Sequence, residues 1–144
     1  MNETIQHFID TKSIAVVGVS DKKFGGAIYK TLKKRGYDVS PVHPTRDKFD
    51  GDKCYSKLTD LPDEIKTAII AVSPKNAEMV VENAIKAGFT HLWFQQGADF
   101  TDSIKKVENS GIRTVSKKCI LMYAEPVTGI HSLHRFLARL FNKA

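Results

Sequence analysis

The chain has 144 residues, 42% of them hydrophobic and 26% charged, with a formal net charge of +6 at pH 7. This length and composition predict one globular domain with a core of its own. No apolar run approaches the ~20 residues of a membrane span and no signal-peptide pattern opens the chain, so no membrane partner is expected. The aromatic residues are not interleaved with lysines as in RNA-binding signatures, so no nucleic-acid partner is expected either. Cys54 and Cys119 form no metal-type pair, and we expect reduced thiols in the cytoplasm.

The first third of the chain predicts a helix, a strand, a tight turn and a second helix. Residues 2–12 have the apolar spacing of a short helix, and residues 14–17 form an apolar run typical of a strand covered on both faces. Gly18 ends this strand, where the backbone must turn sharply and another group comes close. Gly25 then opens a helix that Gly36 ends.

The start of this second helix is a predicted anion site. Free N–H groups and the helix dipole concentrate positive charge there. Lys22 and Lys23, in the loop just before Gly25, add two cations. Together these features predict a ligand that carries phosphate.

Strands and helices alternate along the rest of the chain. We predict strands at residues 38–42, 67–72, 91–95 and 112–115, a polar loop at 45–53 and a short edge strand at 54–58. One further helix is capped by Ser73 and begins at Pro74, and another is capped by Thr101. This alternation predicts an α/β fold, a three-layer, doubly wound, mostly parallel sheet with right-handed crossovers. Residues 129–144 are expected to form a C-terminal amphipathic helix within the single domain 1–144.

Four predicted strand ends carry residues that suit a binding site. Ligands of doubly wound sheets bind beyond the carboxyl ends of the strands, where the strand order reverses. The segments that this fold would bring together are Gly18-Val19-Ser20, Val42-His43-Pro44, Val72-Ser73-Pro74 and Gln95-Gln96-Gly97-Ala98. Their convergence predicts a ligand site at this edge of the sheet.

Two features argue against NAD or a flavin dinucleotide as the ligand. After Gly18 the next glycine is Gly25, so the G-x-G-x-x-G spacing is absent. His43 and Arg46 follow the second strand, where an NAD site would have an acid for the ribose hydroxyl. A cation there suits a phosphorylated ribose, which NADP and coenzyme A both carry.

Five motifs in the same order resemble a known family. They are Val17-Gly18-Val19-Ser20 with the delayed Gly25, Pro41-Val42-His43-Pro44, Ala71-Val72-Ser73-Pro74, Trp93-Phe94-Gln95-Gln96-Gly97-Ala98, and Gly111-Ile112 leading to Lys118-Cys119. Over about residues 10–125 the chain resembles a small stand-alone CoA-binding protein, with the Rossmann-like CoA-binding domain of the succinyl-CoA-synthetase alpha type. Related proteins often carry Asn where this chain has His43.

The resemblance implies a role for each segment of the site. At the pyrophosphate it implies Gly18, Val19, Ser20 and Gly25, with neutralisation by Lys22 and Lys23. At the adenine slot it implies Val42, Pro44, Val72 and Pro74, with Arg46 at the ribose phosphate. His43 and Ser73, which lie within the same two segments, are further candidate cofactor contacts. Along the pantetheine arm it implies Gln96, Gly97 and Ala98.

Cys119 follows Lys117 and Lys118, which would lower its thiol pKa if they lie close. We hypothesise that it sits near the coenzyme thiol and forms a mixed disulfide with it. A buried, inert cysteine is the alternative interpretation.

These residues predict a module that binds coenzyme A or a small acyl-CoA without catalysis. No Ser-His-Asp order, metal-ligand spacing or paired carboxylates stand out, so neither a catalytic residue nor a metal is expected. Two alternatives stay open: an enzyme that uses NADP or an acyl-CoA, and a regulatory protein that acts on nucleic acid or membrane through its basic C-terminal helix. That helix is expected to pack on its own chain or to mediate a homodimer.

Overall fold

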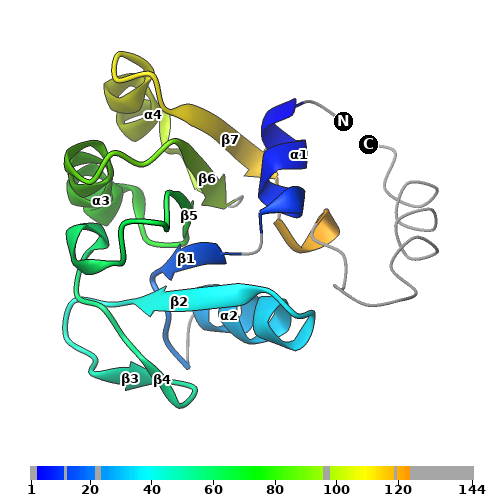
Figure 1. Cartoon of the computed structure of the whole chain (residues 1–144). Helices are drawn as coiled ribbons and strands as arrows, with labels where there is room; N and C mark the ends of the chain where they lie inside the picture. Colours follow the sequence, from blue (N-terminus) through cyan, green and yellow to red (C-terminus); the bar gives the residue numbers. More distant parts are fainter. Residues whose placement is uncertain (1–2, 12, 22–23, 96–97, 119, 124–144) are drawn as a thin grey trace.

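The structure, a computed structural model, describes residues 3–11, 13–21, 24–95, 98–118 and 120–123 (Figure 1). The helices are α1 (Glu3–Asp10), α2 (Phe24–Lys34), α3 (Pro74–Lys86) and α4 (Thr101–Glu108), with the 3-10 turns η1 (Leu58–Asp60) and η2 (Ile120–Met122). The strands are β1 (Ser13–Val17), β2 (Asp38–Val42), β3 (Lys48–Phe49), β4 (Asp52–Lys53), β5 (Thr67–Ile70), β6 (His91–Gln95) and β7 (Arg113–Lys118). The expected C-terminal helix at 129–144 lies outside the described residues.

Five of the strands form one parallel sheet in the order β2-β1-β5-β6-β7. The chain moves outward from β1 to β2, then crosses back to β5 on the other side of β1. The order therefore reverses between β1 and β5, which is the position where sheets of this topology bind nucleotides. The predicted α/β, doubly wound, mostly parallel fold is confirmed.

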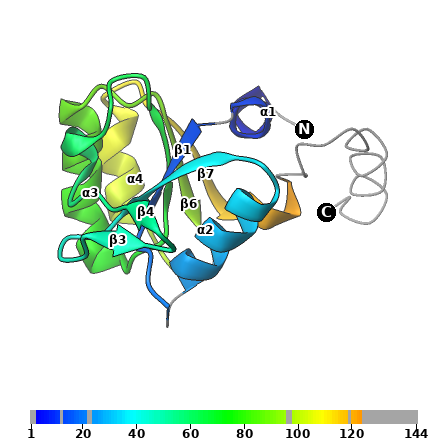
Figure 2. The same cartoon turned by 60° about the horizontal axis from the view of Figure 1, so that its bottom comes forward.

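Helices cover both faces of the sheet. Figure 2 shows α1 and α2 on one face and α3 and α4 on the other. Alternate residues of β1 supply the two cores: Ile14 and Val16 belong to the cluster under α1 and α2, and Ala15 and Val17 to the cluster under α3 and α4. Each large apolar side chain buried in this way contributes about 1.5–3 kcal/mol. Residues 14–17 can all be apolar because both faces of β1 are covered by helices.

Two stacked histidines hold α1 against the strand starts, at the sheet edge opposite the strand ends. The His7 and His91 rings lie 3.6 Å apart and nearly parallel, and His7 Nε2 lies 3.1 Å from Thr67 Oγ1. Burial, followed by the nearby His7 and Arg113, lowers the pKa of His91 from 6.5 to about 4. The stack is therefore built for a neutral His91 at neutral pH.

Two local predictions were wrong. Residues 45–53, expected as a polar loop, contain the antiparallel β3–β4 hairpin. Residues 54–58 form no edge strand: Tyr55 makes an isolated bridge to Val42, and η1 begins at Leu58. Phe49 of this hairpin is 2% exposed and joins the core under α2, so the stretch contributes a buried aromatic ring that a solvated loop would not.

The predicted helix caps are only partly correct. Ser73 occupies the N-cap of α3 in extended conformation, but its side chain makes no capping hydrogen bond to the described residues. Thr101 is the first residue of α4 rather than its cap, and the Asp99 carboxylate accepts from the Thr101 backbone N–H at 3.0 Å. In the described part of the chain, no helix combines the length and apolar character needed to cross a membrane.

Candidate functional site

Gly18 lies at the reversal point of the sheet and lets two strand ends touch. Its φ of +101° is one that residues with a side chain rarely adopt, and its N–H donates to the Val42 carbonyl at 3.0 Å. A Cβ at this position would lie 2.5 Å from the Ala71 carbonyl oxygen. Glycine is therefore required here both by conformation and by space.

The next two glycines bring the start of α2 onto the same turn. A Cβ on Gly25 would lie 2.4 Å from the Gly18 carbonyl oxygen, and one on Gly26 would lie 2.0 Å from the Ser20 carbonyl oxygen. The first turn of α2 therefore packs backbone against backbone on the β1–α2 turn, which includes buried Val19. Because the first N–H groups of a helix lack partners within it, this contact places the positive end of α2 beside the turn.

His43 shapes the chain after β2 with its ring. Its Nδ1 accepts a hydrogen bond from the Thr45 backbone N–H, two residues on, at 3.1 Å. Asn and Asp side chains make the same bond to the second residue after them in Asx turns. His43 thus supplies the turn that an Asn would form there. Burial and the nearby Arg46 both lower the pKa of His43, which favours the neutral ring that can accept this bond.

Arg46 lies across the turn from β1 and rests on an aromatic ring. Its guanidinium carbon is 5.5 Å from the centre of the Phe49 ring. Its Nη2 is 3.7 Å from Oδ2 of Asp21, which belongs to the β1–α2 turn. A cation after β2 and an anion after β1 therefore meet beside the glycine contacts.

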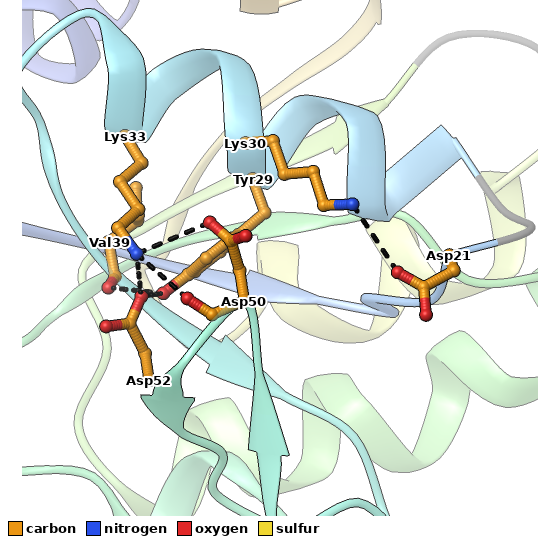
Figure 3. Close-up of polar contacts among 7 residues, drawn as sticks. All are labelled: Asp21, Tyr29, Lys30, Lys33, Val39, Asp50 and Asp52. Carbon is orange, nitrogen blue, oxygen red and sulfur yellow. Dashed lines mark hydrogen bonds and ion pairs between the residues drawn. The ribbon is translucent and has the colours of Figure 1, made fainter.

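The β3–β4 hairpin that carries Phe49 is fastened to α2 by polar contacts (Figure 3). The Tyr29 hydroxyl donates to the Asp52 carboxylate and lies 3.2 Å from the Val39 carbonyl oxygen. Lys33 Nζ lies 2.8 Å from Asp52 and 3.3 Å from Asp50. Lys33 and Tyr29, in that order, lower the pKa of Asp52, while burial and Asp52 raise the pKa of Tyr29. These contacts hold the hairpin against α2, and the hairpin carries the Phe49 ring that Arg46 contacts.

The structure brings together the described residues of the first three predicted segments. Val42 is buried, Val72 is half-buried beside Gly18, and Pro44, Ser73, Pro74 and Ala98 are exposed. Five predicted site residues lie outside the described residues: Lys22, Lys23, Gln96, Gly97 and Cys119. The sequence analysis did not identify Asp21, Lys30 or Phe49 as site residues. The one signal for them was Phe49 itself, because a single aromatic residue within the polar stretch 45–53 suggests a side chain that becomes buried.

A match to a protein family identifies the family of this chain. Residues 12–125 match the family described as "CoA binding domain". The chain belongs to the CoA-binding domain family. The matched range includes every residue of the glycine turn, the hairpin and the sheet.

Proteins similar to this chain include some that are much longer and some of similar length. An acetate–CoA ligase (ADP-forming) of Methanocaldococcus jannaschii is 30% identical over 76% of the chain, which spans only 17% of that ligase. The uncharacterized protein YneT of Bacillus subtilis is 27% identical over 76% of the chain and is covered over 83% of its own length. A hypothetical protein from Pyrococcus horikoshii has a solved structure with a TM-score of 0.76 and 34% identity, covering 83% of this chain and 86% of that protein.

Proposed function

We propose that this protein binds coenzyme A or a small acyl-CoA at the carboxyl edge of its sheet and leaves it chemically unchanged. The observation that carries the proposal is the stacking of Gly18, Gly25 and Gly26, which brings the β1–α2 turn and the start of α2 together at the reversal point. Such a place suits a pyrophosphate, because backbone N–H groups can approach it without interference from side chains. Family membership supports the cofactor.

In this proposal the ligand crosses the edge of the sheet from one side of β1 to the other. The turn at Gly18, Val19 and Ser20 holds the pyrophosphate with Gly25, aided by Lys22 and Lys23. Arg46 meets the ribose phosphate, and its stacking on Phe49 supports this role because it limits the positions of the guanidinium. The proposed adenine contacts are Val42, His43, Pro44, Val72, Ser73 and Pro74, and the proposed pantetheine contacts are Gln96, Gly97, Ala98 and Cys119.

Calorimetric titration and thermal melting with four compounds test this proposal. Coenzyme A should bind and raise the melting temperature, because a ligand that binds only the folded state stabilises it by mass action. Dephospho-CoA should bind more weakly, and NAD and NADP more weakly still. No binding of coenzyme A or acetyl-CoA at millimolar concentration by the folded protein would contradict the proposal.

The absence of catalysis is tested separately. Acetyl-CoA incubated with the protein should be recovered intact, with no more hydrolysis or transfer than in buffer, and NADPH should not be consumed. Protein-dependent turnover of either compound would favour the alternative that the chain is an enzyme.

A further inference from the structure

We propose that Lys30 and Arg46 together form the site for the ribose phosphate, and that the Asp21 carboxylate occupies this site when no ligand is bound. The inference rests on the proposed function and adds two residues to it. Lys30 becomes a second phosphate contact, and Asp21 becomes an internal competitor that sets how strongly the protein distinguishes a phosphorylated ribose from a plain one.

The first observation is that one carboxylate contacts two cations from different elements. Asp21 Oδ1 lies 3.4 Å from Lys30 Nζ on α2, and Asp21 Oδ2 lies 3.7 Å from Arg46 Nη2 in the segment after β2. Figure 3 shows Asp21 and Lys30 facing each other across the start of the helix. An anion therefore already bridges the two positive groups.

The second observation is that both cations share one aromatic support. Lys30 Nζ and the Arg46 guanidinium carbon each lie 5.5 Å from the centre of the Phe49 ring. The ring itself is fixed against the helix, because a Cβ on Gly26 would come within 3.0 Å of its tip. The Lys30–Arg46 pair is thus held together by a buried ring rather than by chance surface geometry.

The third observation is where the pair lies. Asp21 directly follows Ser20, whose carbonyl oxygen makes the closest approach to Gly26 at the start of α2. A ligand whose pyrophosphate lies at that helix start can therefore place a second phosphate beside Asp21. Arg46 follows β2, so the Lys30–Arg46 pair lies toward β2, whereas the segment after β5 lies on the other side of β1.

The charges make an exchange feasible. The side chains of Asp21, Lys30 and Arg46 are 65%, 51% and 35% exposed, and ion pairs this exposed are weak. A phosphate monoester carries close to two negative charges at neutral pH and offers three oxygens, so it can contact both cations more strongly than one carboxylate does. Binding would release Asp21 into solvent, where its charge is readily hydrated.

The test compares the affinities of coenzyme A and dephospho-CoA, which differ only in the ribose phosphate. Asp21→Asn should raise the affinity for coenzyme A about two- to fivefold, the size expected for loss of an exposed ion pair. It should raise the affinity for dephospho-CoA, which keeps the neighbouring pyrophosphate, by a smaller factor. Lys30→Met should lower the affinity for coenzyme A by about two- to fivefold, again with a smaller effect on dephospho-CoA.

The chain provides matched controls in another exposed ion pair. Glu82 and Lys106 lie 2.6 Å apart between α3 and α4, on the other face of the sheet. Glu82→Gln and Lys106→Met change the net charge by the same amounts as the two test variants, so they report the effect of overall charge alone. The ratio of the two affinities should change in the test variants and not in these controls.

The outcomes separate the inference from the proposed function. If the unaltered protein binds neither compound, the proposed function is wrong and the inference falls with it. If it binds coenzyme A but Asp21→Asn and Lys30→Met leave the ratio unchanged or shift it as the controls do, only the inference is wrong. Equal binding of both compounds by the unaltered protein would also overturn the inference.

Discussion

Replacement of Gly25 by alanine tests whether the contact between α2 and the β1–α2 turn creates the ligand site. The new methyl carbon would start 2.4 Å from the Gly18 carbonyl oxygen and 3.2 Å from the Ala71 side chain. Ordinary contacts begin at about 3.4 Å, so the helix start or the turn must move by roughly 1 Å. Overpacking of this kind costs about 1–3 kcal/mol. For a domain of this length, that corresponds to a melting temperature lowered by about 3–10 °C.

The same displacement should also weaken binding. Hydrogen bonds between backbone N–H groups and a charged phosphate contribute about 1.5–3 kcal/mol each, so loss of even one lowers the affinity for coenzyme A at least about tenfold. Calorimetry at a temperature where the variant is fully folded measures this loss, and circular dichroism gives the melting temperature.

Gly111→Ala is the control for Gly25→Ala. Gly111 has a φ of +84°, but nothing lies within 4 Å of where its Cβ would be. The control should therefore cost about 1–2 kcal/mol of stability through conformation alone and leave the affinity for coenzyme A unchanged. If Gly25→Ala bound coenzyme A as tightly as the unaltered protein, the reasoning that places the pyrophosphate at this contact would be refuted.

Three further predictions concern the hairpin and the histidine stack. Tyr29→Phe should lower the free energy of unfolding in urea by about 1–3 kcal/mol, because the hydroxyl bonds to Asp52 and the Val39 carbonyl are lost. Phe49→Ala should cost about 3–5 kcal/mol as a core truncation and should also reduce the preference for coenzyme A over dephospho-CoA, since the ring supports Arg46. Stability should fall as the pH decreases from about 6.5 to about 4, because the unfolded chain takes up a proton at His91 that the folded chain excludes. The half-buried ring limits this loss to about 1–2 kcal/mol, and His91→Asn should flatten this part of the stability curve.

The sheet and the glycine turn could be predicted from the sequence because each depends on local chemistry. An apolar run such as 14–17 has few stable locations other than a strand covered on both faces. Gly18 was expected to allow a close approach, and the Ala71 carbonyl is the group that approaches it. The prediction of Thr101 as a cap relied on one residue type at one position, and it was wrong: Phe100 is the N-cap of α4, and the Asp99 carboxylate accepts from the Thr101 N–H.

His43 shows that an imidazole can form the kind of turn that an Asn side chain forms. By the resemblance described above, related proteins often carry Asn where this chain has His43. In the structure, Nδ1 accepts from the Thr45 N–H as an Asn side chain oxygen would. The equivalence depends on which ring nitrogen faces the backbone, and a sequence does not contain that information.

The hairpin and the cation pair could not be predicted because their contacts join elements that the sequence keeps apart. Lys30 follows Asp21 by nine positions, so a helical side-chain pattern of three or four residues gives no reason to connect them. Phe49 stands alone among polar residues and acquires partners only when β3 folds back onto α2. Most charged side chains on a protein surface are simply solvated and have no specific role. Considered one at a time, Asp21, Lys30 and Arg46 would each be interpreted in this way. Once a buried ring holds two cations around one carboxylate beside an anion-binding helix start, the group acquires a function that none of its members has alone, and exchange of the carboxylate for a phosphate is the simplest one.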